Sequence, residues 1–144
     1  MDSLMWGVEI TPLRSIQTDQ GDVLHGIRKT DATFYGFGEA YFSSVLPGCL
    51  KGWKRHREMT LNLIVPVGSI RFVVFKNHDS CVINTAIDVI LGRENYSRIT
   101  IPPGLWVGFQ GLGHNENMLL NVATHEHDPL EFDTIGISEL DYKW

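Results

Sequence analysis

The sequence predicts an all-β sandwich or barrel, and two observations lead to this fold class. Gly and Pro residues interrupt the 144-residue chain so often that long helices are disfavoured. Between these breaks lie short segments rich in β-branched and aromatic residues, at a spacing typical of sandwiches and barrels. The chain length and the 43% hydrophobic content suit one globular domain, which we expect to span residues 1–144.

Five strands are expected in chain order, at 39–45, 60–67, 69–76, 97–101 and 118–124. The turn at 66–68 is expected to pair the second and third of these strands as a hairpin. A further turn is predicted at Ile101-Pro-Pro-Gly-Leu-Trp-Val-Gly-Phe, because proline restricts φ and glycine accepts a positive φ. The segment 85–91 is the one short helix that the pattern allows.

Composition argues against several classes of partner. The formal net charge of −5 disfavours nucleic acid and anionic membranes. No stretch approaches the roughly 18 apolar residues of a membrane span, and residues 1–14 lack the apolar region of a signal peptide. Cys49 and Cys81 lack metal-binding spacing and are expected to be two buried thiols. We therefore expect a cytoplasmic protein.

The most uneven feature is the basic segment 51–57, Lys51-Gly-Trp-Lys-Arg-His-Arg, which holds four of the twelve Lys and Arg residues. In an extended strand the side chains would alternate, with Lys54 and His56 on one face and Trp53, Arg55 and Arg57 on the other. One face would then line a cavity for an anionic ligand, with His56 transferring protons near neutral pH. The alternative is a solvated edge strand whose positive charges discourage aggregation.

A second cluster, Thr124-His-Glu-His-Asp-Pro-Leu-Glu, contains two histidines one residue apart and a glutamate four residues later. This spacing is similar to part of the ligand set of metal-binding cupins. A further histidine would complete such a set, and none follows His127. Polar residues leaving the final strand are the simpler interpretation, and a metal centre of His125, His127 and Glu131 is an alternative.

Three segments in order resemble the cupins that act on nucleotide-linked 4-keto-6-deoxy sugars. They are the basic segment 51–57, Leu61-Asn-Leu-Ile-Val-Pro-Val-Gly-Ser, and Ile101-Pro-Pro-Gly-Leu-Trp-Val-Gly-Phe. Both dTDP-4-dehydrorhamnose 3,5-epimerase and the sugar-nucleotide 3,4-ketoisomerases show similar motifs in this order. The resemblance, over roughly residues 37–131, implies a cupin double-stranded β-helix, or jelly-roll barrel. It also implies a homodimer formed by an exchanged edge strand, and an isomerase of surface-polysaccharide biosynthesis that needs no cofactor.

The chain departs from these relatives at several site positions. Lys51 stands where the family has an arginine, and Lys54 stands where both relatives have a histidine. His56 matches the second histidine of the ketoisomerases, whereas Val107 replaces the histidine after their I-P-P-G-x-W motif. The segment 118–124 has no tyrosine, where the epimerase carries its acid.

The resemblance implies a keto sugar, whose hydrogens next to the carbonyl are acidic, so the site needs a base and a group that stabilises an enolate. We predict His56 as the base, Lys54 as the stabilising charge and His125 as a replacement for the missing tyrosine. Predicted substrate-binding residues are Lys51, Arg55 and Arg98 for the diphosphate, Tyr41, Trp53 and Trp106 for stacking, and Glu39 and Asn62 as polar groups facing the cavity. Epimerisation and keto-isomerisation both remain open, and the alternative is a non-catalytic cupin that binds a sugar or sugar nucleotide.

Overall fold

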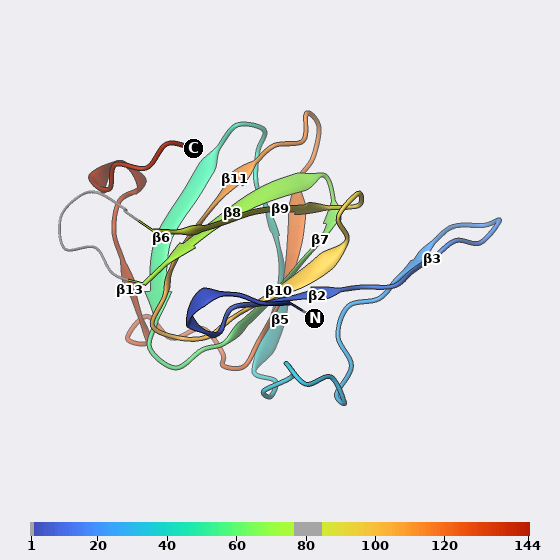
Figure 1. The fold of residues 1–144 in the computed structure, drawn as a ribbon, viewed down its shortest axis with the longest axis horizontal. Helices are drawn as coiled ribbons and strands as arrows, with labels where there is room; N and C mark the ends of the chain where they lie inside the picture. The colour runs from blue at the N-terminus through green and yellow to red at the C-terminus, as the bar shows by residue number, and fades with distance from the viewer. Residues whose placement is uncertain (1, 77–84) are drawn as a thin grey trace.

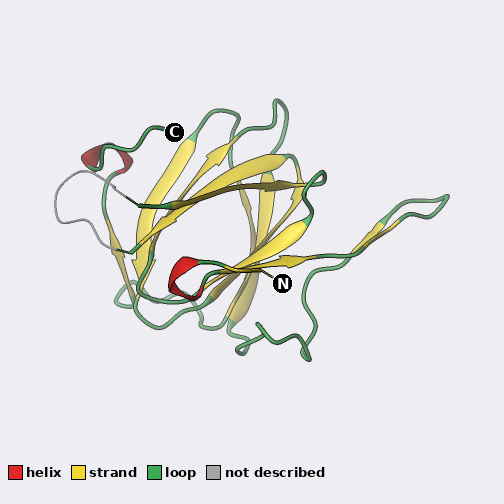
Figure 2. Cartoon of the chain, in the orientation of Figure 1, coloured by secondary structure: helices red, strands yellow, loops and turns green. Residues whose placement is uncertain are grey.

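The computed structural model describes residues 2–76 and 85–144, which form two antiparallel β-sheets packed face to face (Figures 1 and 2). The first sheet has the order β1 (Asp2–Ser3), β2 (Glu9–Pro12), β10 (Ser97–Ile101), β7 (Leu61–Val67), β12 (Met118–Ala123) and β5 (Glu39–Ser44). The second has the order β13 (Phe132–Thr134), β6 (Leu50–His56), β11 (Trp106–Gly111), β8 (Ser69–Phe75) and β9 (Ile87–Gly92). From β5 to β8 and from β9 to β13, successive strands alternate between the sheets, which confirms the predicted all-β jelly roll.

A small hairpin of β3 (Ser15–Ile16) and β4 (Val23–Leu24) projects away from the barrel (Figure 1). The helices of the described residues are single 3-10 turns, at Met5–Gly7 and Ile137–Glu139 (Figure 2). No helix in the described part of the chain has the length and apolar character needed to cross a membrane.

The core lies between the two sheets because inward positions of the strands are apolar. On β7, Leu61, Leu63 and Val65 belong to this core, and they meet Phe72 and Val74 of β8 from the opposite sheet. Fully burying one such side chain contributes roughly 1.5–3 kcal/mol, so the alternating pattern holds the sheets together. The strands predicted from β-branched and aromatic content are therefore confirmed to within a residue or two.

The predicted hairpin between the second and third strands is wrong. β7 pairs with β10 and β12, whereas β8 pairs with β9 and β11 in the other sheet. Gly68, with φ of +78°, turns the chain from one sheet to the other. Asn117 holds this corner, since its Oδ1 accepts hydrogen bonds from the backbone N–H groups of Ser69 (3.0 Å) and Gly113 (2.8 Å). The two strands thus bury their apolar faces against each other across the core instead of side by side.

Three further sequence expectations are corrected. The segment predicted as a short helix forms strand β9, because Ile87, Val89 and Leu91 face the core with a period of two. The turn predicted after Ile101 is confirmed, with φ of +88° at Gly104, but it is shorter than expected, because Trp106–Gly111 form strand β11. Cys49 is exposed rather than buried, and Cys81 lies outside the described residues.

Candidate active site

A cavity of about 340 Å³ opens between the two sheets. Its apolar part is formed by inward side chains of strands β7, β11 and β12, namely Leu61, Leu63, Val107, Phe109 and Leu119, and Gly52 and Trp53 of β6 also line it. Its polar part is formed by Tyr41, Ser43, Lys51, Lys54, His56, Asn121 and Thr134. Within the described lining there are two lysines and no carboxylate, so the cavity favours an anionic ligand.

Strand β6 presents different residues on its two faces, as the alternation predicts. Lys54 and His56 line the cavity, whereas the guanidinium of Arg55 lies on the outer side, 4.6 Å from the ring of Trp106. The ring of Trp53 belongs to the same outer side, where it packs against Phe75 at 5.1 Å. Lys51, Lys54 and His56 therefore serve the cavity, Trp53 borders it while its ring packs in the outer cluster, and Arg55 lies on the outer face.

Lys51 joins the cavity because β6 carries a bulge. Lys51 pairs with Phe109 and Lys54 pairs with Val107, so three steps along β6 match two steps along β11. A bulge of this kind redirects side chains, and it places Lys51 and Lys54 on the same side of the strand. Strict alternation would have put Lys51 on the outer face with Arg55.

His56 is held by a buried carboxylate. Its Nδ1 lies 2.6 Å from Oε1 of Glu131, and both side chains are at least nine-tenths buried. The other oxygen, Oε2, accepts hydrogen bonds from the backbone N–H groups of Arg57, Glu58 and Met59 at 2.9–3.0 Å. Burial raises the pKa of Glu131, but the hydrogen bonds from Glu58, His56 and Met59 outweigh it and bring the pKa to about 2.

The ionised Glu131 decides which nitrogen of His56 is available. A carboxylate accepts hydrogen bonds only, so it keeps a proton on Nδ1 of His56 and leaves Nε2 to accept one. Because His56 also lines the cavity, this arrangement is that of a base oriented by a carboxylate. The two residues are 75 positions apart, and no local pattern in the sequence signals their contact.

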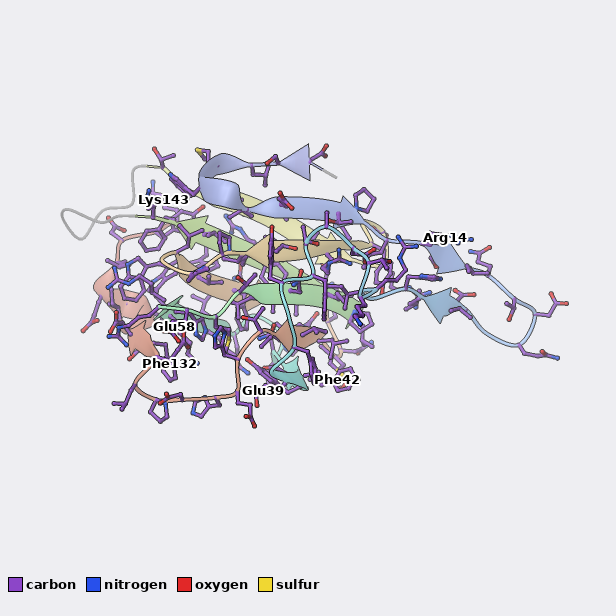
Figure 3. All side chains as sticks on the ribbon, turned by 90° about the horizontal axis from the view of Figure 1, so that it is seen from below. Arg14, Glu39, Phe42, Glu58, Phe132 and Lys143 are labelled. Carbon is purple, nitrogen blue, oxygen red and sulfur yellow. The ribbon has the colours of Figure 1, made fainter. Side chains whose placement is uncertain are left out.

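Lys54 is positioned by an aromatic ring from the neighbouring strand β13. Its Nζ lies 4.3 Å from the centre of the Phe132 ring, and the His56 ring lies 5.7 Å from the same centre. Such a cation–π contact helps to fix the ammonium group next to the imidazole. Figure 3 shows Phe132 together with Glu58 at the end of the barrel opposite to Arg14 and the projecting hairpin.

A comparison with known proteins identifies the family. No family model matches the chain. The crystal structure of a dTDP sugar isomerase from Desulfovibrio desulfuricans G20 is 33% identical, has a TM-score of 0.87, and is matched over 96% of this chain and 91% of its own. The chain belongs to this family of dTDP-sugar isomerases.

Two further relatives of this isomerase-family chain agree with the resemblance read from its motifs. A dTDP-4-dehydrorhamnose 3,5-epimerase from Sulfolobus tokodaii shares the fold, with a TM-score of 0.81 and 22% identity over 98% of this chain and 84% of its own. The probable low-salt glycan biosynthesis epimerase Agl13 of Haloferax volcanii is 26% identical over 125 residues, which are 84% of this chain and 80% of that protein. The predicted relationship to these isomerases is confirmed.

Two residues that the sequence predicted to contact the ligand, Arg98 and Asn62, lie outside the cavity. Arg98 is buried on the outer face of the first sheet, where its terminal nitrogens donate to the carbonyl of Gly26 (2.6 Å) and to Oγ1 of Thr33 (2.8 Å). Asn62 donates to the carbonyl of Thr33 (3.1 Å) and accepts from Thr100 (2.6 Å) on the same face. Asn62 faces outward because Leu61 and Leu63 on either side of it face inward, and Arg98 faces outward because the next residue, Ile99, faces inward. They hold the segment 26–33 against the sheet.

Three more residues that the sequence predicted to bind the substrate also lie outside the cavity, whereas a fourth lines it. Glu39 begins β5 opposite Ala123 and is not part of the cavity lining. Arg55 donates to Asp133 at 2.9 Å on the outer face, and Trp106 packs there with it. Tyr41, by contrast, lines the cavity, and its hydroxyl accepts a hydrogen bond from Nδ2 of Asn121 at 3.1 Å.

The side chains of His125, His127 and Glu131, which the sequence offered as an alternative metal centre, point to different partners in the fold. His125 is exposed, with Nε2 4.0 Å from Oε2 of Glu58, and it does not line the cavity. The ring of His127 packs against Phe132 at 5.5 Å, and Glu131 points to His56. Within residues 2–76 and 85–144, no three His, Cys, Asp or Glu side chains are grouped to hold a metal ion. The arrangement does not support the proposed roles of His125 as an acid or as a metal ligand.

Proposed function

We propose that the chain is an epimerase of a nucleotide-linked 4-keto-6-deoxy sugar in the biosynthesis of a surface polysaccharide or glycan. The observation that carries this proposal is the His56–Glu131 pair, which faces a cavity rich in lysine and free of carboxylates among its described lining residues. The relatives support the substrate class, because one is a dTDP sugar isomerase and another a glycan biosynthesis epimerase. The proposed chemistry uses the sugar's own carbonyl to acidify the neighbouring hydrogen.

In the first step, Nε2 of His56 removes a proton from the carbon next to the carbonyl. The electron pair of that C–H bond forms the enolate double bond, and the carbonyl oxygen takes the negative charge. The ammonium of Lys54 stabilises this oxygen, since a preorganised charge is worth more in a partly dry cavity than in water. Glu131 stabilises the imidazolium that His56 becomes.

The second proton transfer is assigned to Tyr41, in place of the predicted His125. Tyr41 comes from β5 in the first sheet, whereas His56 comes from β6 in the second. The Tyr41 hydroxyl accepts a hydrogen bond from Asn121, so its own proton is free to be donated to the enolate carbon. A sugar ring between the sheets presents opposite faces to the two residues. Removal from one face and return to the other inverts the carbon, which is epimerisation rather than keto-isomerisation.

Lys51 is the residue proposed for the diphosphate. Its Nζ donates to the carbonyl of Ser44 at 2.6 Å and lies 3.4 Å from Oγ of Ser43, at the cavity edge. Two donors on this ammonium are then committed to β5, and the third is left for a phosphate oxygen. Arg55 and Arg98 are not proposed for this role, because their guanidinium groups are engaged outside the cavity.

A homodimer is proposed as the working form. The hairpin of β3 and β4 projects from the barrel (Figure 1). Val23 on this hairpin is 52% exposed. Strand β5 is at the edge of its sheet and carries Phe42, which is labelled in Figure 3. The Phe42 side chain is 64% exposed. Sedimentation equilibrium tests this, and a monomer at micromolar concentration would contradict it. The cytoplasmic location stays a prediction.

Solvent isotope exchange tests the proposed reaction. The protein is incubated with dTDP-4-keto-6-deoxyglucose in deuterated water, and deuterium at C3 or C5 is followed by NMR. The proposal expects deuterium incorporation together with an inverted stereocentre. Binding of the nucleotide sugar without exchange above the buffer rate would instead support the non-catalytic cupin.

The Tyr41→Phe variant separates the two proton transfers. Because His56 and Glu131 are untouched, exchange of the hydrogen removed by His56 is expected to continue. Inversion is expected to fall by about 10²-fold or more, since the donor on the opposite face is lost. Parallel loss of exchange and inversion would remove Tyr41 from the role of a separate second donor.

A further inference from the structure

The carboxamide of Asn121 stands out in the cavity because half of it is unpaired. Asn121 lies on β12 between Leu63 of β7 and Tyr41 of β5, and its side chain is almost fully buried. Its Nδ2 donates to the Tyr41 hydroxyl at 3.1 Å. Its Oδ1 is buried and has no hydrogen-bond partner among the described residues.

An unpaired carbonyl oxygen inside a protein is costly, and native structures satisfy nearly all such groups. The cross-strand neighbours of Asn121 do not donate a hydrogen bond to its Oδ1. Leu63 carries no donor, and the Tyr41 hydroxyl already accepts from the other half of the carboxamide. Asn121 lines the cavity, so the donor for Oδ1 has to come from the cavity, from water when it is empty and from a ligand that displaces this water.

The two walls of the cavity differ in the hydrogen-bonding groups that they offer to a ligand. The β6 wall offers Lys51 and Lys54, whose ammonium groups donate hydrogen bonds and cannot accept them. The wall formed by β12 offers the Oδ1 of Asn121, which accepts and cannot donate. A ligand that carries both a carbonyl and a hydroxyl is therefore oriented, with its carbonyl towards the lysines and its hydroxyl towards Asn121.

We propose that Asn121 is a specificity-determining residue that binds a ring hydroxyl of the sugar through its Oδ1. The inference rests on the proposed function for the class of ligand, and it adds which group of the ligand is recognised and from which wall. Binding this hydroxyl holds the ring with its carbonyl at Lys54 and its acidic hydrogen at His56. A sugar that lacks the hydroxyl leaves Oδ1 buried and unpaired, and it is rejected for that reason.

The test measures binding of sugars that do not react, because they carry no carbonyl. Titration calorimetry compares dTDP-6-deoxyglucose with its 2-deoxy and 3-deoxy analogues on the full chain. The wild type is expected to bind the parent about 10-fold or more tightly than the analogue that lacks the recognised hydroxyl. Asn121→Leu, close in size, is expected to bind the parent and that analogue equally.

Two matched variants keep the test decisive if Asn121→Leu folds poorly. Asn121→Asp keeps an acceptor at this position and is expected to retain the preference for the hydroxyl. Tyr41→Phe removes the neighbouring hydroxyl but leaves Oδ1 in place, so it is also expected to retain the preference. Loss of the preference in Tyr41→Phe would assign the recognition to Tyr41 and overturn the proposal.

The proposal is also overturned if the wild type binds both deoxy analogues as tightly as the parent, or if Asn121→Leu keeps the preference. These outcomes are separate from a failure of the proposed function. A chain that discriminates between the ligands but catalyses no deuterium exchange has the hydroxyl site without the reaction. A chain that catalyses exchange without discrimination has the reaction without this site.

Discussion

Two buried polar clusters, one on the outer face of the first sheet and one on the second sheet beside the cavity, show what separates a structural cluster from a functional one. On the outer face, the terminal nitrogens of Arg98 are bound to Gly26 and Thr33. Inside the barrel, Glu131 binds only one nitrogen of His56, and the imidazole also faces the cavity. Both groups are buried and hydrogen-bonded, so burial alone does not distinguish them. The cavity next to His56 makes the difference, because a ligand can reach the nitrogen that the protein leaves unused.

The largest effect that this comparison predicts is for His56→Asn. The variant keeps a polar group of similar size but loses the base, so deuterium exchange is expected to fall by about 10²–10⁴-fold. Binding of dTDP is expected to remain within about 3-fold, since the lysines are unchanged. Exchange rates by NMR and titration calorimetry measure the two quantities. Exchange at the wild-type rate would place the base elsewhere.

The second prediction concerns Glu131 and pH. Its folded pKa of about 2 lies below the ordinary glutamate value of 4.5, so its ionised form stabilises the fold at pH values above 4.5. This contribution, about 3 kcal/mol, is lost as the pH falls from about 4.5 towards 2. Urea unfolding between pH 6 and pH 3 is expected to show a falling free energy of unfolding in the wild type.

Glu131→Gln serves as the control for this pH dependence. Glutamine fits the space but does not titrate, so the variant is expected to be less stable at pH 6 and to lose much less stability on acidification. Its exchange activity is also expected to fall, because a neutral amide no longer stabilises the imidazolium of His56. An equally steep loss in the variant would assign the acid sensitivity to other carboxylates.

A smaller and different effect is predicted for Arg98→Met. The variant leaves Gly26 and Thr33 without their buried donor, so the free energy of unfolding is expected to fall by about 1–3 kcal/mol. The KM for the nucleotide sugar is expected to change less than about 2-fold, because Arg98 does not line the cavity. Thermal unfolding and steady-state kinetics measure the two effects. A large rise in KM with unchanged stability would show that Arg98 takes part in substrate binding.

The smallest effect is predicted for Arg55→Gln on the outer face of β6. Its ion pair with Asp133 is partly exposed, with 39% of the Arg55 side chain accessible, so water screens the attraction and the pair adds little to stability. Both stability and exchange activity are therefore expected to stay near those of the wild type. A strong loss of activity in Arg55→Gln would show that the outer face of β6 takes part in the site.

Some features of the site could be predicted from the sequence because they are local. The alternation of side chains along an extended strand is a property of neighbouring residues, and it correctly assigned Lys54 and His56 to one face and Arg55 to the other. Alternation alone does not account for the place of Lys51 in the cavity lining, because the bulge in β6 depends on its pairing with β11. The Gly68 turn was recognisable, but its pairing was not, since only the opposing sheets decide where β7 and β8 lie.

The sequence by itself determined the all-β class, most of the long strands, the concentration of positive charge on β6 and the family resemblance. Only the tertiary structure brought Glu131 to His56 and Asn121 to Tyr41, across 75 and 80 residues of chain. It also turned Arg98 and Asn62 away from the cavity and left His125 exposed. The physical reason is that strand periodicity follows from adjacent residues, whereas the partner of a buried polar group is set by which strands pair across the barrel.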